Sequence, residues 1–545
     1  MSKGTVPKEA KETNVAGAAG ARLSLTMALL LMAVAIAGCS MNPVTREREF
    51  IPFSTEHEIE SGRKHYRPTQ QAQGGRYKAD PALNEYVMRV GRRVAKVSDR
   101  KLPYEFVVLN NGTPNAWALP GGKIAINRGL LLEMENEAEL AAVLAHEVVH
   151  AAARHGAQAM TRNLIFQVAQ AGVALASGAS RHSRYTNYIL GASGVGLQLV
   201  GRKYGRDAER EADVHGMRYM KAAGYDTRAA VTLQEKFLAL SKGRKEDWLQ
   251  GLFATHPPSA ERVKNNRAAL ARFPAGGDTG RERYDKALSY LRAKRPAYAA
   301  ADRARAAMDK APARALVLVH KAIAREPREA LFHGLEGQIQ ARRSRFAKAV
   351  EAYSAAIKRD AAYYEHFLGR GLAYDALGRR PQARRDLERS MQLLPTALAS
   401  HALGHIVLAE GDRARAKSLF GDAANVRGDI GEAARRSFVM LDVADAPERY
   451  VTAQPFLRSG QVLVELTNKT SVPLAGVAVQ VEARTRESSL PRRLSPTRLA
   501  GRATVVLASG IWYRGTDRIN VSVKVLRARP AAARTAKARP YRAYP

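Results

Sequence analysis

Cysteine is the scarcest residue in this chain, with one among 545 residues, at position 39. A single cysteine excludes any disulfide within the chain. Acidic residues are also few, 51 against 87 lysines and arginines, which leaves a net charge of +36. So basic a balance first suggests nucleic acid as a partner. The length is too great for one core and predicts about three domains.

The apolar run near the N-terminus, residues 23–37, is too short to span a bilayer as a helix. It follows several lysines and fits the apolar region of a signal peptide. It ends at Ile36-Ala37-Gly38-Cys39, which resembles the lipobox of bacterial lipoproteins. We therefore expect residues 1–39 to be a lipoprotein signal peptide, with Cys39 as the lipidation site. A simple signal or an uncleaved anchor is the alternative.

Export changes the meaning of the positive charge, because an exported protein meets little nucleic acid. We expect no nucleic-acid partner, and a basic surface that either faces anionic lipid headgroups or reflects an arginine-rich source organism. Ser40 follows the cysteine, and by resemblance to lipoprotein sorting in enteric bacteria this favours the outer membrane. The expected location is the cell envelope, lipid-anchored and facing the periplasm.

The most informative stretch is His146-Glu147-Val148-Val149-His150, inside an alanine- and leucine-rich segment. Residues 137–156 predict one helix, with Gly156 as its C-terminal cap. Two histidines four apart share a helix face and can bind one zinc ion. Glu147 is turned by about 100° and can act as general base on a metal-bound water. The alternative is two partly exposed histidines on an amphipathic helix.

A site with two histidines needs a third protein ligand. Residues 207–213 lie on a second predicted helix, which ends near Gly224. Glu209 and Asp213 share a face of it, so one carboxylate could bind the metal while the other orients a ligating histidine. Glu211 falls on another face and is predicted to be solvated. Ordinary salt bridging with nearby basic residues is the alternative for the two carboxylates.

Several motifs follow one another in order, at residues 115–124, 128–131, 136–141, 146–150 and 209–213. Together they resemble the gluzincin superfamily that contains the CAAX prenyl proteases and the heat-shock membrane protease HtpX. Asn42-Pro43-Val44-Thr45 resembles the start of its periplasmic lipoprotein members. The resemblance implies one zinc ion per chain, bound by His146, His150 and Glu209. It also implies that Glu147 is catalytic and that Asp213 supports one of the metal ligands from outside the metal's own shell.

The resemblance also assigns roles to two further segments. Lys123-Ile124-Ala125-Ile126 predicts a strand, and in the resembling proteases such a strand lies at the cleft edge. Gly122, Lys123, Ile124 and Ala125 are therefore expected to bind an extended substrate by strand addition. His256, in residues 255–262, matches a histidine that lipoprotein members use as a plug at zinc's open position. The alternative is that its neighbours Pro257 and Arg262 only cap and pin the next helix.

Residues 275–445 contain a repeat of about 34 residues, typical of tetratricopeptide repeats. Each of three copies places a glycine, then an alanine, then a large apolar residue in register: Gly337, Ala349 and Tyr353; Gly371, Ala383 and Leu387; Gly404, Ala416 and Phe420. Ala315, Val319 and Ala322 fit a degenerate earlier copy. A generic alanine-rich bundle is the alternative. Such solenoids bind extended segments or partner proteins.

From residue 447 the pattern changes to alternating, β-branched segments at 461–468, 477–483, 503–508 and 519–525, which predict a small β-sandwich. Residues 527–545 are rich in Arg, Ala and Pro and predict a disordered basic tail. The expected fold class is α+β: a mainly helical zinc peptidase domain at 40–270, an α-solenoid at 275–445 and a β-sandwich at 446–526.

The combined hypothesis is a zinc endopeptidase of the bacterial envelope that degrades or processes misfolded or stalled envelope proteins, held inactive by His256. Its expected partners are extended or misfolded envelope proteins, and outer-membrane assembly machinery through the repeats. The alternative is a periplasmic chaperone or assembly scaffold with secondary or silenced proteolysis.

Overall fold

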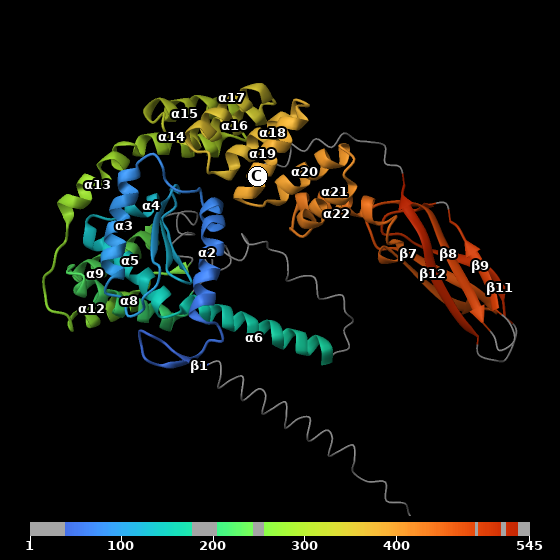
Figure 1. Ribbon diagram of the computed structural model, residues 1–545, viewed down its shortest axis with the longest axis horizontal. Helices are drawn as coiled ribbons and strands as arrows, with labels where there is room; N and C mark the ends of the chain where they lie inside the picture. Colours follow the sequence, from blue (N-terminus) through green and yellow to red (C-terminus); the bar gives the residue numbers. More distant parts are fainter. Residues whose placement is uncertain are drawn as a thin grey trace, which may run out of the picture. The chain divides into compact units, whose positions relative to one another are not determined.

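The computed structural model describes residues 39–176, 204–243, 255–484, 489–496, 498–513 and 519–531 (Figure 1). The predicted signal peptide up to residue 38 and the tail from residue 532 lie outside these ranges. The chain divides into two compact units, and residues 71–79 group with the second although both their neighbours in sequence belong to the first. Within the described ranges, no helix has the length and apolarity needed to cross a bilayer.

A three-stranded sheet lies in the first unit, in the order β3 (Glu105–Leu109), β5 (Lys123–Asn127), β4 (Ala116–Leu119). Strand β5 pairs in parallel with β3 and antiparallel with β4, so it is central. The prediction that residues 122–125 form a substrate-binding edge is therefore wrong. All five residues of β5 are buried, and a strand paired on both sides has no free backbone groups to offer a substrate.

Helix α5 (Glu137–Ala152) lies at the centre of the first unit and contacts α3 (Pro81–Ala95), α8 (Arg206–Ala222), α9 (Arg228–Gly243) and strand β4 (Figure 1). Every residue of α5 except His146 is buried, as expected of a helix that is apolar around its circumference. Asn136 caps its N-terminus by accepting a hydrogen bond from the backbone N–H of Glu139 at 2.9 Å.

The end of α5 differs from the prediction. The helix stops at Ala152, and α6 (His155–Ala176) begins before Gly156, the predicted cap. The turn is made by Arg154, whose φ of 64° is left-handed. This conformation is unusual for a residue other than glycine. It is compensated because Nε of Arg154 donates to Oε1 of buried Glu58 in α2 (Thr55–Ala72) at 2.7 Å.

The first unit continues past the predicted boundary at residue 270, to Ser289. Tyr284 of α13 (Arg281–Ala293) explains this, since it is fully buried and donates a hydrogen bond to the carbonyl of Leu131 at 2.6 Å. Residues 71–79 belong to the second unit because they contact its residues. Lys78 pairs with Asp360 of the repeats at 2.5 Å.

The repeats form antiparallel helix pairs in the second unit: α14 (Arg295–Ala307) with α15 (Pro312–Arg325), α16 (Ala330–Arg342) with α17 (Phe346–Arg359), α18 (Tyr364–Ala376) with α19 (Arg380–Leu393), and α20 (Ala397–Ala409) with α21 (Arg413–Ala424), followed by α22 (Asp429–Asp442). The predicted small-to-large contacts are confirmed. A Cβ added at Gly337 would lie 2.9 Å from the ring of Tyr353, and one at Gly404 would lie 2.6 Å from the ring of Phe420.

The second unit ends in two sheets that share one apolar core. One sheet has the order β10 (Arg498–Leu499), β8 (Leu474–Arg484), β12 (Asn520–Pro530), with β9 (Ser489–Leu494) also pairing to β8. The other has the order β11 (Thr504–Trp512), β7 (Gln461–Asn468), β6 (Val451–Arg458). Strand β12 corrects the predicted start of the basic tail at 527, because it runs to Pro530 and buries Ala528 between exposed Arg527 and Arg529, after a register shift at residues 525–527.

Candidate metal centre

Four side chains converge where α5 packs against α8. His146 and His150 from α5, Glu209 from α8 and His256 hold their ligating atoms within 4.8 Å of one another. Nε2 of His150 lies 3.0 Å from Nε2 of His146 and 3.4 Å from Oε1 of Glu209. The predicted helical spacing places His146 beside His150, the packing of α5 on α8 adds Glu209, and the cluster could hold a metal ion.

Glu147 lies beside this cluster and is almost completely buried, with 1% of its surface exposed. Its Oε1 is 3.5 Å from Nε2 of His256, and its Oε2 has no hydrogen-bond partner among the described residues. Burial raises the pKa of the Glu147 carboxyl above its ordinary value. A carboxylate with a raised pKa and an open acceptor atom is suited to take a proton from a reacting group.

Asp213 lies one turn after Glu209, as predicted, and faces a histidine. Its Oδ1 is 3.1 Å from Nδ1 of His146, which leaves Nε2 of that ring for the cluster. Burial works to raise the pKa of Asp213, but the neighbouring Arg262 and His146 outweigh it and hold the pKa at about 2. The carboxylate therefore stays ionised and can orient the histidine.

His256 belongs to the cluster and contacts two of its other members. Its Nδ1 lies 2.8 Å from Oε1 of Glu209 and 3.3 Å from Nε2 of His146. Arg262, six residues further on, forms ion pairs with Asp213 and Glu209, and Ser259 caps α12 (Ala260–Leu270). The histidine therefore faces the site and Arg262 pins the helix that follows, while Ser259 rather than Pro257 caps that helix. The role of His256 as a plug stays a prediction.

Three residues at the site were not predicted. Tyr204 stacks on His150, with ring centroids 4.0 Å apart and planes 16° from parallel. His155 places Nδ1 2.7 Å from Nδ1 of His150, and Glu211 places Oε2 3.4 Å from Nε2 of His155. The prediction that Glu211 is solvated is wrong, because α8 turns that carboxylate toward His155. Helical periodicity gave no signal for His155, since the turn at Arg154 separates it from α5.

The donor set fits a zinc ion. Two imidazoles and one carboxylate, with a fourth position beside a general base, are the ligands that catalytic zinc uses in proteins. The open Oε2 of Glu147 supports this fit, because a buried carboxylate oxygen without a partner is costly unless a water or an ion completes it.

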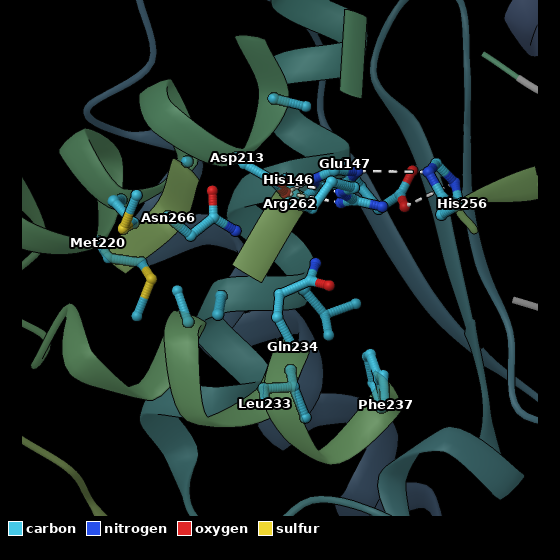
Figure 2. A pocket seen from close by; sticks show the side chains of 16 residues that line it. His146, Glu147, Asp213, Met220, Leu233, Gln234, Phe237, His256, Arg262 and Asn266 are labelled. Carbon is cyan, nitrogen blue, oxygen red and sulfur yellow. Dashed lines mark hydrogen bonds and ion pairs between the residues drawn. The ribbon is translucent and has the colours of Figure 1, made fainter. Parts of the chain in front are cut away.

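A pocket extends from this polar cluster between α5, α8 and α9 (Figure 2). One end is lined by His146, Glu147, Asp213, His256 and Arg262. The lining also includes apolar Met217, Met220, Leu233 and Phe237 and the amides of Gln234 and Asn266. In Figure 2 the labelled Leu233 and Phe237 lie across the pocket from Arg262 and His146. A molecule held here would meet the buried carboxylate at one end and an apolar surface at the other.

Known proteins resemble this chain most clearly around the site. The profile of Peptidase family M48 matches residues 81–269. The putative beta-barrel assembly-enhancing protease of Vibrio cholerae is 31% identical over 36% of this chain and 40% of its own length. The mitochondrial metalloendopeptidase OMA1 of Schizosaccharomyces pombe is 34% identical over 41% of this chain and 64% of its own length. The chain thus spans less than two thirds of either relative.

Two further proteins, one of known structure and one known by its sequence, are also similar to parts of this chain. The crystal structure of MamA is 20% identical over 32% of this chain and 95% of its own length, but the TM-score of 0.23 supports no conclusion about this protein. The metalloprotease YcaL of Escherichia coli is 30% identical over 34% of this chain and 71% of its own length. With the profile match across residues 81–269, that relationship shows that the chain belongs to peptidase family M48.

Proposed function

We propose that this protein is a zinc-dependent endopeptidase with its reaction centre at His146, His150, Glu209 and Glu147. The observation that carries the proposal is the meeting of three donor groups within 4.8 Å, directly beside a buried carboxylate with an open oxygen. Two helices separated by more than fifty residues supply these groups. A structural role alone gives no reason to bury a partnerless carboxylate oxygen there.

Zinc held by His146, His150 and Glu209 would polarise the scissile carbonyl and acidify a water. With zinc bound, Glu147 would accept the proton from that water and return it to the leaving amine. Asp213 accepts the hydrogen bond from Nδ1 of His146 and fixes which ring nitrogen faces the centre. Because the cluster is buried, these charged groups act with little screening by solvent.

The apolar end of the pocket suggests the kind of residue that the enzyme accepts. Met220, Leu233 and Phe237 would surround a substrate side chain held next to Glu147. A medium-sized apolar side chain removes its surface from water there, at about 25 cal/mol per Å² buried. We therefore propose a preference for apolar residues beside the cleaved bond.

His256 is proposed to hold the resting enzyme inactive. Its Nδ1 lies nearer to Glu209 Oε1 than does Nε2 of His150, at 2.8 Å against 3.4 Å. An imidazole in this position can take the fourth ligand site and displace the water. Activation then requires an event that moves residues 255–262 away, and the activator must bind the open state more tightly than the closed one.

Substrates and location are extensions of the same proposal. One relative carries a name that refers to beta-barrel assembly, which supports a role in the cell envelope. Cys39 is proposed as the lipid anchor from the residues that precede it. Helical repeats such as α16–α21 bind extended segments in other proteins. Misfolded or stalled envelope proteins are therefore the proposed substrates. The competing proposal is an assembly scaffold, favoured by the position of His256, in which proteolysis is silenced.

The decisive experiment compares Glu147→Gln and Glu209→Gln with the wild type. Glu147→Gln keeps the metal ligands, so it should bind one zinc per chain and lose cleavage of an unfolded casein substrate by several orders of magnitude. Glu209→Gln should lose zinc itself. Asp207→Asn, on the same helix with 96% of its side chain exposed, is the control. Undiminished cleavage by Glu147→Gln would refute the mechanism, and rescue of an envelope defect by that variant would favour the scaffold.

A further inference from the structure

We propose that His155 and Glu211 form a relay that positions the metal ligand His150, with Asn42 from the N-terminal hairpin holding Glu211 in place. The relay rests on the proposed function, since it requires a metal at His146, His150 and Glu209. The three residues come from distant parts of the sequence. None of them was assigned a role at the site from the sequence.

The hydrogen-bonding of His150 requires a partner for its second nitrogen. Nε2 faces His146 and Glu209, so it is the atom available to a metal. Nδ1 lies 2.7 Å from Nδ1 of His155, and His150 has no exposed side-chain surface. A neutral His150 that binds metal through Nε2 carries its proton on Nδ1, so Nδ1 of His155 must be the acceptor.

The position of the ring proton of His155 follows from this. If Nδ1 accepts, the proton of a neutral His155 is on Nε2. That atom lies 3.4 Å from Oε2 of Glu211, within ion-pair distance, but no described residue accepts a hydrogen bond from it in this geometry. A carboxylate oxygen at this distance attracts the N–H of Nε2, which favours the tautomer of His155 that leaves Nδ1 free to accept from His150. The ring is 1% exposed, which leaves no solvent to offer an alternative partner.

Asn42 fixes the outer end of the relay. Its Oδ1 accepts hydrogen bonds from the backbone N–H of Val44 at 2.9 Å and of Thr45 at 3.3 Å, which sets the orientation of the amide. Nδ2 is then directed at Oε1 of Glu211, 3.2 Å away. Asn42 is completely buried. The hairpin of β1 (Cys39–Met41) and β2 (Arg48–Phe50) therefore reaches the metal centre through the Glu211 carboxylate.

The left-handed turn at Arg154 is what brings His155 back toward His150. Arg154 is held there by Glu58 and by Ser40, to which its Nη1 donates at 2.5 Å. Strained non-glycine residues cost about 1–3 kcal/mol and persist where the surrounding structure determines them. His146 has a direct carboxylate partner in Asp213, whereas His150 obtains its carboxylate through a second imidazole.

The test measures zinc affinity of the full chain by competition with a chelator, using zinc alone as the probe. His155→Leu removes the acceptor and should weaken zinc binding about ten- to a hundredfold. His155→Asn has nearly the same shape as leucine, but its Oδ1 can accept from His150, so it should lose less affinity than His155→Leu. Its loss should be similar to that of Glu211→Gln, because both variants lose the contact between residue 155 and the carboxylate. Glu211→Gln and Asn42→Ala should weaken binding, whereas Asp207→Asn on the same helix should not.

The outcomes separate the relay from the proposed function. If Glu209→Gln does not weaken zinc binding, the metal site itself is refuted. If Glu209→Gln weakens it but Glu211→Gln and His155→Leu bind as tightly as the wild type, only the relay is refuted. Equal losses in His155→Leu and His155→Asn would also overturn it, because packing would then explain both. Urea unfolding of the metal-free variants identifies any that fail to fold. If His155→Leu fails to fold, Glu211→Gln still tests the relay, because the Glu211 side chain is partly exposed.

Discussion

Arg262 forms a bidentate ion pair with Asp213, with Nη2 2.7 Å from Oδ1 and Nε 2.9 Å from Oδ2. Its third nitrogen, Nη1, lies 2.9 Å from Oε2 of Glu209. One guanidinium on α12 therefore joins Glu209 and Asp213 of α8. Since His256 precedes α12 by four residues, this contact also fixes where the histidine can lie.

Arg262→Met should destabilise the metal-free protein by about 3–5 kcal/mol, because it leaves two buried carboxylates without their cation. Bound zinc should reduce the loss, since it restores positive charge beside Glu209. Urea unfolding with and without zinc measures both effects. Arg262→Lys is the matched control and should lose less, because it keeps the charge but not the bidentate geometry. A loss below about 1 kcal/mol in Arg262→Met, as for an exposed pair, would show that the ion pair is not structural.

His256→Ala should raise basal proteolysis, because the fourth ligand position opens to water while His146, His150 and Glu209 remain. Cleavage of an unfolded substrate, together with zinc content, measures this. His320→Ala is the control, since that histidine lies on the repeats with about half of its side chain exposed. Lower activity in His256→Ala with an intact fold would instead make His256 a residue that contacts substrate.

Cys39→Ser should abolish lipid attachment and leave the protein as a precursor or free in the periplasm. Several acyl chains anchor a protein stably, whereas one gives only marginal binding. Fractionation after a high-salt wash is the measurement, because salt removes proteins held only by basic surface. Mature Cys39→Ser protein that stays in the outer-membrane fraction would indicate another anchor.

The surroundings of Asp442 predict that the second unit loses stability in acid. Burial works to raise its pKa, but hydrogen bonds from Lys417 and Tyr450 outweigh it and hold the pKa below the ordinary value. A carboxyl with a lowered native pKa contributes stability above its unfolded pKa of about 3.9, and the contribution is lost as the pH falls through the native pKa.

Asp442→Asn should therefore lower the stability of the second unit at pH 7 and reduce its further loss as the pH falls below about 4. Urea unfolding at several pH values measures the difference from wild type. Asp302→Asn, at an exposed position of α14, is the control. An unchanged pH dependence in Asp442→Asn would show that other carboxyls carry the acid sensitivity.

The sequence determined those parts of the site that depend on spacing within one helix. His146 and His150 share a face of α5, and Glu209 and Asp213 share a face of α8, because both pairs are four residues apart. The repeat could also be predicted from residue spacing. A glycine and a large residue recur in register, as Gly337 and Tyr353 do, because each pair of helices solves the same local packing problem.

Tertiary structure alone decided the contacts between segments. Whether β5 is an edge or the centre of its sheet depends on where β3 and β4 pair, which no property of residues 123–127 specifies. The left-handed conformation of Arg154 depends on Glu58, nearly a hundred residues away, and turns His155 toward His150. Glu211 is equally polar in either setting, and only the packing of α8 on α5 turns it from solvent toward the metal centre.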